Sequence, residues 1–232
     1  MHRPNDRSTR LDIAATLVLA ALLLTVSSCT LPNGRGNTSS TTPPATDLIR
    51  VAPALVAVDR IHVVVEIPAG TNDKWEVDKG TGALHWERKN GVPRVVQYLA
   101  YPGNYGMIPH TALPTAEGGD GDPLDVLLLG PAIERGSVVT ARPVAVFRLL
   151  DDGERDDKII AVPLEGPFSD VRTLADLDAH YRGAREIILT WFANYKGPGR
   201  ITPVGFEDVD RAVAVVRQAS AAFEGTGLRG SE

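Results

Sequence analysis

Ile61-His62-Val63-Val64-Val65-Glu66-Ile67 is a run in which five of seven residues are β-branched, and Pro68 ends it. Because β-branched side chains favour extended backbone, this run predicts a buried strand. Further apolar runs follow it, with turn residues such as Gly70, Gly91 and Gly136 between them. These predicted strands are Val95–Tyr98, Leu124–Leu129, Val138–Leu150 and Lys158–Val162. The first half of the folded chain is therefore predicted to be sheet.

Two helices are predicted after the strands. The first spans about Leu174 to Tyr195, with apolar residues at helical spacing, and Gly197-Pro198-Gly199 ends it. The second spans Glu207 to about Phe223 and opens with acidic residues, which suit the helix dipole. Strands followed by helices predict an α+β fold: a small closed OB-like five-stranded β-barrel with additional strands and two C-terminal helices.

The composition narrows the classes of function. The chain has 232 residues, enough for one sizeable core, and a formal net charge of -5. This acidic balance argues against nucleic acid as a partner, because a backbone-binding surface would be basic. Cys29 is the one cysteine, so the folded part has no internal disulfide, no multi-cysteine zinc site and no catalytic thiol. A metal must therefore bind to oxygen or imidazole ligands.

The N-terminal segment has the layout of a signal peptide. Three arginines precede the apolar run Ile13–Val26, and Val26-Ser27-Ser28-Cys29 resembles a bacterial lipobox, whose cysteine receives a lipid. Thr30–Thr46 is rich in Ser, Thr, Pro and Gly, as in a flexible tether. We expect a lipoprotein signal peptide at 1–28, a lipidated tether at 29–47 and a catalytic domain at 48–232, anchored extracytoplasmically to a bacterial membrane. The alternative is an ordinary signal peptide with an incidental cysteine.

The stretch Asp120-Gly121-Asp122-Pro123-Leu124-Asp125 places three carboxylates within six residues, directly before a predicted strand. Alone, such a turn is more often a solvated loop. Its spacing excludes an EF-hand, in which the sixth position is glycine. A second acidic group at Asp151, Asp152 and Asp156, with Glu66 and Glu76, favours an oxygen-ligand site for magnesium or manganese. Cations and phenols interleaved with these acids match a polyanionic substrate: Lys74, Arg88, Lys158, Lys196, Tyr101, Tyr105 and Tyr195.

Ordered motifs between Ile61 and Lys196 resemble the soluble family I inorganic pyrophosphatases. They are VVEIP (64–68), KWEVDKGTGAL (74–84), YPGNYGMIPHT (101–111), DGDPLDVL (120–127), DDGERDDKIIAV (151–162) and NYK (194–196). The resemblance implies hydrolysis of inorganic pyrophosphate to two phosphates by metal-activated water. It also implies Mg²⁺ as the cofactor, with Mn²⁺ or Zn²⁺ as substitutes, and allows a homo-oligomer.

The resemblance also implies a role for individual residues. Asp122 would be the general base, and Tyr105 would lie beside the nucleophile. The implied metal ligands are Asp120, Asp125, Asp156, Asp151 and Glu76. The implied phosphate contacts are Lys74, Arg88, Lys158, Tyr195 and Lys196. The implied supporting residues around them are Glu66, Asp152, Tyr101 and Asn104.

Two other functions are compatible with parts of this pattern. One is a catalytically silent anchored protein that binds metal or phosphate, and the other is an oligonucleotide-binding barrel, which rests on fold analogy alone. The segment Lys89–Leu99 is longer and more polar than the resemblance predicts. It is expected to alter a rim or a subunit contact.

Overall fold

The β-branched run at 61–67 forms strand β2 (Arg60–Ile67) in the computed structural model, which describes residues 46–113, 119 and 121–225. The predicted signal peptide and tether, Cys29 and Asp120 lie outside the described residues. The other strands are β1 (Leu55–Ala57), β3 (Trp75–Val77), β4 (Leu84–Trp86), β5 (Arg88–Lys89), β6 (Val92–Pro93), β7 (Asn104–Met107), β8 (Asp125–Leu128), β9 (Val138–Asp151), β10 (Glu154–Arg155), β11 (Lys158–Pro163) and β12 (Ile201–Asp208). The helices are α1 (Leu174–His180), α2 (Ala184–Asn194) and α3 (Val209–Gly225).

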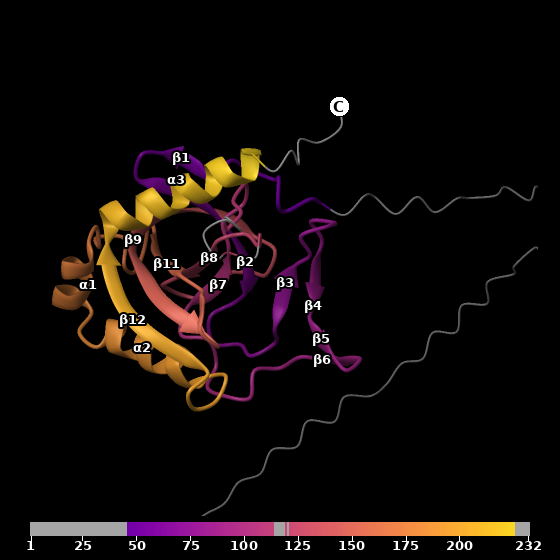
Figure 1. The fold of residues 1–232 in the computed structure, drawn as a ribbon. Helices are drawn as coiled ribbons and strands as arrows, with labels where there is room; N and C mark the ends of the chain where they lie inside the picture. Colours follow the sequence, from indigo (N-terminus) through magenta and orange to yellow (C-terminus); the bar gives the residue numbers. More distant parts are fainter. Residues whose placement is uncertain (1–45, 114–118, 120, 226–232) are drawn as a thin grey trace, which may run out of the picture. The chain divides into compact units, whose positions relative to one another are not determined.

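The strand pairings of the main sheet return to their starting point. β2 pairs with β7, β7 with β8, β8 with β11, β11 with β9, and β9 again with β2. Among the strand pairs of the described residues, only β8–β11 is parallel. The 14-residue strand β9 is long enough to pair with β2 near its start and with β10 and β12 toward its end. The pairs β3–β4 and β5–β6 form two separate small sheets (Figure 1).

Helices cover the sheet on two sides. On β9, Phe147 packs with α2 residues such as Phe192, whereas its neighbour Val146 packs with α3 residues such as Val216. Neighbouring strand residues point to opposite faces, so one strand contributes to both clusters. Figure 1 shows α3 crossing the strands on one side and α2 beside β12. Both faces of the central strands are therefore buried.

The helical region differs from the prediction, because three helices replace two. The predicted helix 174–195 is interrupted between His180 and Ala184, where Gly183 has a left-handed φ of 87° that an α-helix does not accommodate. Thr173 and Asp176 form a capping box at the start of α1. Helix α3 begins at Val209, close to the predicted start.

The strand predictions are confirmed for 61–67, 124–129, 138–150 and 158–162 to within two residues. Val95–Tyr98 was predicted wrongly, since only Val95 forms an isolated bridge, to Asp73. Strand β12 was missed because it contains Pro203 and Gly205, which are uncommon in strands. The two residues flank a register shift. Proline is tolerated there because β12 pairs with β9 alone. Among the described residues, no helix has the length and apolarity needed to cross a membrane.

Candidate active site

The candidate site lies where the sheet brings several strand ends together. β8 begins with Asp125 and its parallel neighbour β11 begins with Lys158, and the register Ile159↔Val126 places these two starts side by side. β9 runs antiparallel to β11, so its last residue, Asp151, belongs to the same end of the sheet. Strand pairing therefore brings Asp125 to the same end of the sheet as Asp151 and Lys158, although it is far from them in the sequence.

Two adjoining cavities open at this end of the sheet. The first, of ≈ 340 Å³, we call the acidic cavity; its carboxylates are Glu66, Glu76, Asp78, Asp122, Asp125 and Asp156. The second, of ≈ 310 Å³, we call the central cavity; it adds Glu87, Asp151, Glu154, Arg94, Arg155, Lys158, Tyr195 and Lys196. Both cavities are lined by Lys74, Glu76, Tyr105, Asp122, Asp125 and Asp156. Together they form one cleft.

A buried lysine links two of the predicted metal ligands. The Lys158 side chain is 2% exposed, and its ammonium forms ion pairs with both Asp125 and Asp156. Burial lowers the pKa of Lys158, but the two carboxylates outweigh that effect and hold the pKa above its ordinary value. The pKa of Asp156 is raised, mainly by burial and also by the charge of Asp125, with Lys158 opposing the shift. Positive charge is thus strongly favoured between these two carboxylates.

Tyr105 is placed at the same carboxylate pair. Its hydroxyl donates a hydrogen bond to Oδ2 of Asp125 at 2.6 Å. Two ammonium groups lie near its ring: the Nζ atoms of Lys74 and Lys158 are each 5.9 Å from the ring centroid. Burial, followed by the charge of Asp125, holds the pKa of Tyr105 well above its ordinary value, so the phenol stays a hydrogen-bond donor.

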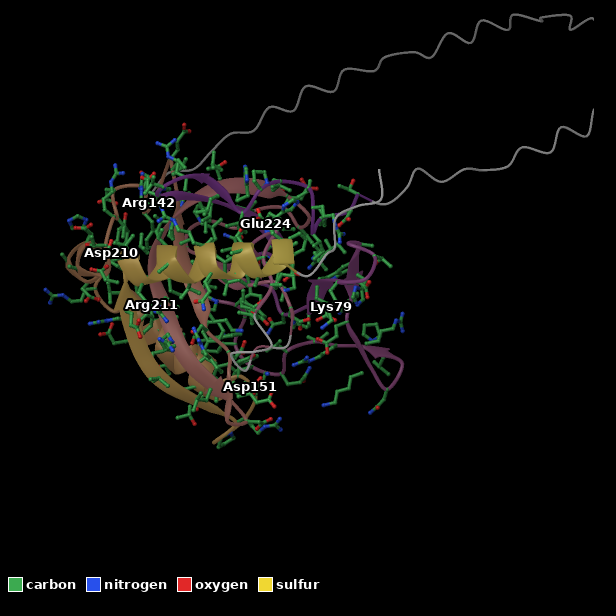
Figure 2. All side chains as sticks on the ribbon, turned by 45° about the horizontal axis from the view of Figure 1, so that its top comes forward. Lys79, Arg142, Asp151, Asp210, Arg211 and Glu224 are labelled. Carbon is green, nitrogen blue, oxygen red and sulfur yellow. The ribbon has the colours of Figure 1, made fainter. Side chains whose placement is uncertain are left out.

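Asp122 and Glu76 line the cleft from its more open side. The side chain of Asp122 is 48% exposed and forms an ion pair with Lys79. Glu76, on β3, lies 3.4 Å from the Nζ atom of Lys74 and 3.5 Å from Nε2 of His85. Lys79 lies on the side of β3 and β4, and Asp151 lies at the end of β9 (Figure 2). Asp122 is therefore exposed to solvent and also lines the cleft beside the other carboxylates.

The donor chemistry of the cleft fits a hard divalent cation. The carboxyl Oδ1 atom of Asp151 is buried and lacks a hydrogen-bond partner, while Oδ2 pairs with Lys196. An oxygen in that state has a lone pair available for a cation. Within the described part of the chain, which leaves out Asp120, no three Asp, Glu, His or Cys side chains form a ready metal-binding group. Lys158 and Lys196 instead stand beside the carboxylates.

The structure places Arg88, an implied phosphate contact, apart from the cleft and places another arginine, Arg94, in it. Arg88 lies outside the cleft, and its guanidinium donates to the Gly91 carbonyl at 2.6 Å. Arg94 lines the central cavity. The reason is the hairpin β5–β6: Asn90 and Gly91 both have positive φ, which reverses the chain after Lys89. The Asn-Gly pair is the sequence signal that predicts this hairpin.

The remaining predicted residues support the cleft or lie outside it. Glu66 is 5% exposed and accepts a hydrogen bond from Val77 N at 2.7 Å; burial raises its pKa to about 8. Asn104 is buried, and its Oδ1 atom accepts from Ala69 N at 3.1 Å and Ile133 N at 2.8 Å. These bonds tie together the loops behind the site. Asp152 is exposed and pairs with Arg200, away from both cavities.

The phenols of the site form one aromatic cluster. The ring of Tyr101 lies 5.2 Å from the ring of Tyr105 and 4.4 Å from that of Trp191. Tyr195 stacks on Trp191 at 4.6 Å and lines the central cavity. Burial is the main cause that raises the pKa of Tyr101 and of Tyr195, so both stay protonated. Tyr195 is the C-cap residue of helix α2, so the end of this helix positions it in the central cavity.

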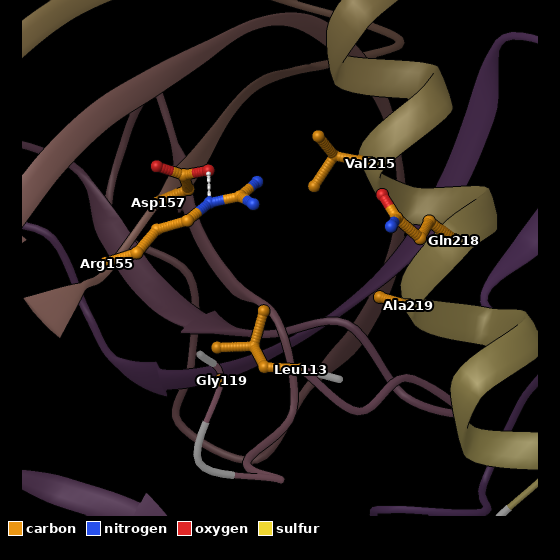
Figure 3. A pocket seen from close by; sticks show the side chains of 7 residues that line it. All are labelled: Leu113, Gly119, Arg155, Asp157, Val215, Gln218 and Ala219. Atoms are coloured by element: carbon orange, nitrogen blue, oxygen red, sulfur yellow. Dashed lines mark hydrogen bonds and ion pairs between the residues drawn. The ribbon is translucent and has the colours of Figure 1, made fainter. Parts of the chain in front are cut away.

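Sequence reasoning missed the residue that holds the turn around Asp156. Asp157 is buried, and its carboxylate accepts hydrogen bonds from Arg155 at 2.7 Å and from Arg148 at 2.9 Å. These bonds fix the backbone between the two site residues that flank Asp157 in sequence, Asp156 and Lys158. Figure 3 shows Arg155 and Asp157 beside a small cavity that faces Val215 and Ala219 of α3. At ≈ 30 Å³ that cavity is a packing gap.

An α+β domain with a cleft of carboxylates, interleaved lysines and protonated phenols has the equipment of a phosphohydrolase, which must neutralise anionic oxygens and activate water. Comparisons with known proteins define the family. The inorganic pyrophosphatase family model matches residues 63–224. An inorganic pyrophosphatase of Gluconobacter oxydans is 37% identical over 183 residues, which cover 76% of this chain and 98% of that protein.

Solved structures agree with this assignment. The inorganic pyrophosphatase of Helicobacter pylori superposes with a TM-score of 0.64 at 34% identity, covering 75% of this chain and 99% of that one. A truncated Trypanosoma cruzi vacuolar soluble pyrophosphatase in complex with PPi superposes with a TM-score of 0.70 at 27% identity, covering 80% of this chain and 77% of that one. The chain belongs to the inorganic pyrophosphatase family. The predicted enzyme class, an inorganic diphosphatase, is confirmed.

Proposed function

We propose that this chain hydrolyses inorganic pyrophosphate to two phosphates within the cleft, in a reaction that depends on Mg²⁺. The observation that carries the proposal is the pairing of buried Lys158 with Asp125 and Asp156, which demonstrates a strong demand for positive charge at carboxylates of the cleft. Pyrophosphate hydrolysis requires little covalent chemistry from the protein, so charge neutralisation and positioning dominate. Bound divalent ions supply charge neutralisation and a lowered pKa for the attacking water.

The ligands for those ions are the cleft carboxylates. We assign Asp125, Asp156, Asp151 and Glu76 to this role, together with Asp120, which lies outside the described residues. All are oxygen donors, which favours Mg²⁺, with Mn²⁺ or Zn²⁺ as substitutes. The unpaired Oδ1 atom of Asp151 supports the assignment. Lys158 and Lys196 then exchange part of their carboxylate contacts for phosphate oxygens.

The other residues of the cleft act on the water and on the phosphates. Asp122, half exposed and lining both cavities, accepts the proton from the attacking water. Tyr105 orients Asp125 through its hydrogen bond. Phosphate oxygens are held by Lys74, Lys158, Lys196 and Tyr195, and by Arg94 in place of Arg88. A guanidinium offers a fork of donors, whereas each lysine acts as a point charge.

The test is phosphate release from pyrophosphate with Mg²⁺ for the wild type, Asp120→Ala and Asp125→Ala. We expect each variant to lose about 10²–10³-fold or more in kcat, since each removes a charge that the reaction requires. Asp178→Ala, on helix α1, is the matched control and should retain full activity. Full activity of either variant at saturating metal would refute the site. A wild type that binds pyrophosphate without turnover would establish the silent binding protein instead.

We also propose that the protein is a lipoprotein, anchored outside the cytoplasm of a bacterial cell through Cys29. The proposal is supported by the arginines and apolar run before Cys29 and by the polar segment after it. Cys29→Ala should release the protein from the membrane fraction, with Ser28→Ala as the control that retains it. Unchanged fractionation of Cys29→Ala would refute lipidation.

Two structural details belong to the same proposal. The ring of pairings among β2, β7, β8, β11 and β9 supports the OB-like five-stranded barrel. A homo-oligomer stays a prediction of the family resemblance, which size-exclusion chromatography with light scattering would test.

A further inference from the structure

A third cavity, which we call the basic cavity, adjoins the cleft. Its volume is ≈ 600 Å³, compared with ≈ 310 Å³ for the central cavity. Four residues line both: Glu87, Arg94, Tyr195 and Lys196. The basic cavity is therefore continuous with the part of the cleft in which phosphate oxygens are held.

The lining of the basic cavity is rich in cations. Five cations line it, Arg88, Lys89, Arg94, Lys196 and Arg200, against the single carboxylate of Glu87. Lys196 and Arg200 also form ion pairs with Asp151 and Asp152, which do not line this cavity. Both oxygens of Glu87 accept hydrogen bonds from Arg94, at 2.7 Å each, so that carboxylate is already neutralised. The whole chain carries a net charge of -5, which means that this concentration of cations is local.

Part of this charge has no counter-charge nearby. Within the described ranges, Lys89 forms no ion pair and Arg88 bonds only to a backbone carbonyl, that of Gly91. Both residues lie on β5, in the hairpin whose segment is longer and more polar than the family resemblance predicts. The hairpin thus places two cations beside the cleft, and neither of them contacts a carboxylate of the cleft.

The ligand that fits is a phosphate chain longer than pyrophosphate, whose additional phosphates stay joined to the phosphate that reacts. A linear condensed phosphate carries negative charge on every phosphate, so each added phosphate needs a further cation to neutralise it. Pyrophosphate needs only the cleft. Arg94, Tyr195 and Lys196 line both cavities, so a phosphate they hold has its next neighbour in the basic cavity.

We propose that the basic cavity is a subsite for the trailing phosphates of linear condensed phosphates, with tripolyphosphate the shortest, whose terminal anhydride is cleaved in the adjoining cleft. This inference rests on the proposed function. Water adds to the terminal phosphorus, the P–O bond to the bridging oxygen breaks, and that oxygen leaves with the shortened chain. One water is consumed for each orthophosphate released: one of its protons stays on the orthophosphate and the other passes to solvent. Tripolyphosphate yields orthophosphate and pyrophosphate.

The test compares kcat/KM for tripolyphosphate and pyrophosphate, with products followed by ³¹P NMR. Lys89→Glu should lower kcat/KM for tripolyphosphate about tenfold, as expected for a lost charge-assisted contact, and leave the value for pyrophosphate within about twofold. Lys89→Arg should restore the tripolyphosphate value. Arg217→Glu, an exposed position on α3 with the same change in net charge, should alter neither substrate.

Each outcome decides the inference. Selective loss in Lys89→Glu with rescue by Lys89→Arg supports it. Equal loss for both substrates, or no effect of Lys89→Glu, overturns it, as does a wild type that cleaves pyrophosphate but not tripolyphosphate. Those results leave the proposed function intact, because the wild type still hydrolyses pyrophosphate. If the wild type cleaves neither substrate, the proposed function fails and the inference fails with it.

Discussion

The acidic cavity belongs to the cleft and the basic cavity adjoins it; the two share no lining residue and differ in the charge of their side chains. The acidic cavity is lined by six carboxylates with two lysines, and the basic cavity by five cations with one carboxylate. The central cavity between them mixes both signs. A metal-dependent phosphohydrolase needs both environments, because cations bind to carboxylates and phosphates bind to cations. Separating them along a cleft prevents the protein's own charges from cancelling completely.

The two ends are also built differently. Asp125 and Lys158 begin β8 and β11, where sheet register fixes their positions, and Asp156 lies two residues before β11. Arg88 and Lys89 stand on a two-residue strand of the β5–β6 hairpin, which is outside the main sheet. Asp125 and Lys158, which are assigned to the reaction, therefore lie on the main sheet, whereas the two cations proposed to bind the trailing phosphates lie on the separate hairpin.

The largest effect is expected from replacing Lys158, because this lysine compensates the negative charge of Asp125 and Asp156. Lys158→Met leaves Asp125 and Asp156 without their cation, and removing one partner from a buried ion pair costs about 3–5 kcal/mol. We expect a lower Tm without metal, partial recovery with Mg²⁺, and a loss of about 10²-fold or more in kcat/KM. Differential scanning fluorimetry with and without Mg²⁺ measures the first two effects. An unchanged Tm in EDTA would contradict the charge assignment.

Two arginines test where the cleft ends and the basic cavity begins. Arg94→Ala should lower kcat/KM for pyrophosphate about 10- to 100-fold, since it removes charge-assisted contacts to phosphate. Arg88→Ala should change that value by less than about threefold, because Arg88 lines only the basic cavity. Steady-state kinetics on the pair gives the answer. A larger loss for Arg88→Ala would restore the assignment made from sequence and contradict the structural one.

A smaller effect concerns pH and the acidic end. Burial raises the pKa of Glu66 from 4.5 to about 8, so between these values the native state holds a proton that the unfolded state has released. The contribution of Glu66 to the free energy of unfolding is fully present below pH 4.5 and is lost as pH rises through 8. The free energy of unfolding then falls by at most about 1.4 kcal/mol per pH unit. Glu66→Gln removes this dependence. Urea unfolding in EDTA from pH 5 to 9 should show the variant gaining on the wild type as pH rises, and parallel curves would disprove the shift.

Much of the fold was predictable from local patterns. The β-branched run at 61–67 and the long apolar run at 138–150 became β2 and β9, because side chains of that shape and polarity suit buried strands. The break between α1 and α2 at Gly183 and the strand β12 were missed. In both places glycine or proline has a role that depends on neighbouring elements: a left-handed residue before α2, and a register shift against β9.

The candidate site was predictable in kind and less so in detail. Asp125, Asp156, Tyr105, Lys74 and Lys196 do line one cleft, because charged side chains placed beside buried strands must gather at a sheet end. Arg88 was assigned to phosphate by the family resemblance, which does not show where the β5–β6 hairpin places each arginine. The Asn90-Gly91 pair is the sequence signal for that hairpin, but its consequence for Arg94 depends on where the hairpin docks.

The sequence by itself determined the family and the chemistry of the donors, since residue type sets charge, ligand hardness and turn preference. Only the tertiary structure decided that Lys158 pairs with both Asp125 and Asp156, that Asp157 holds the backbone between Asp156 and Lys158, and that a basic cavity adjoins the cleft. These relations join residues up to more than a hundred positions apart, as from Arg88 to Arg200. Strand register and hairpin docking set such distances, and both are properties of the folded chain.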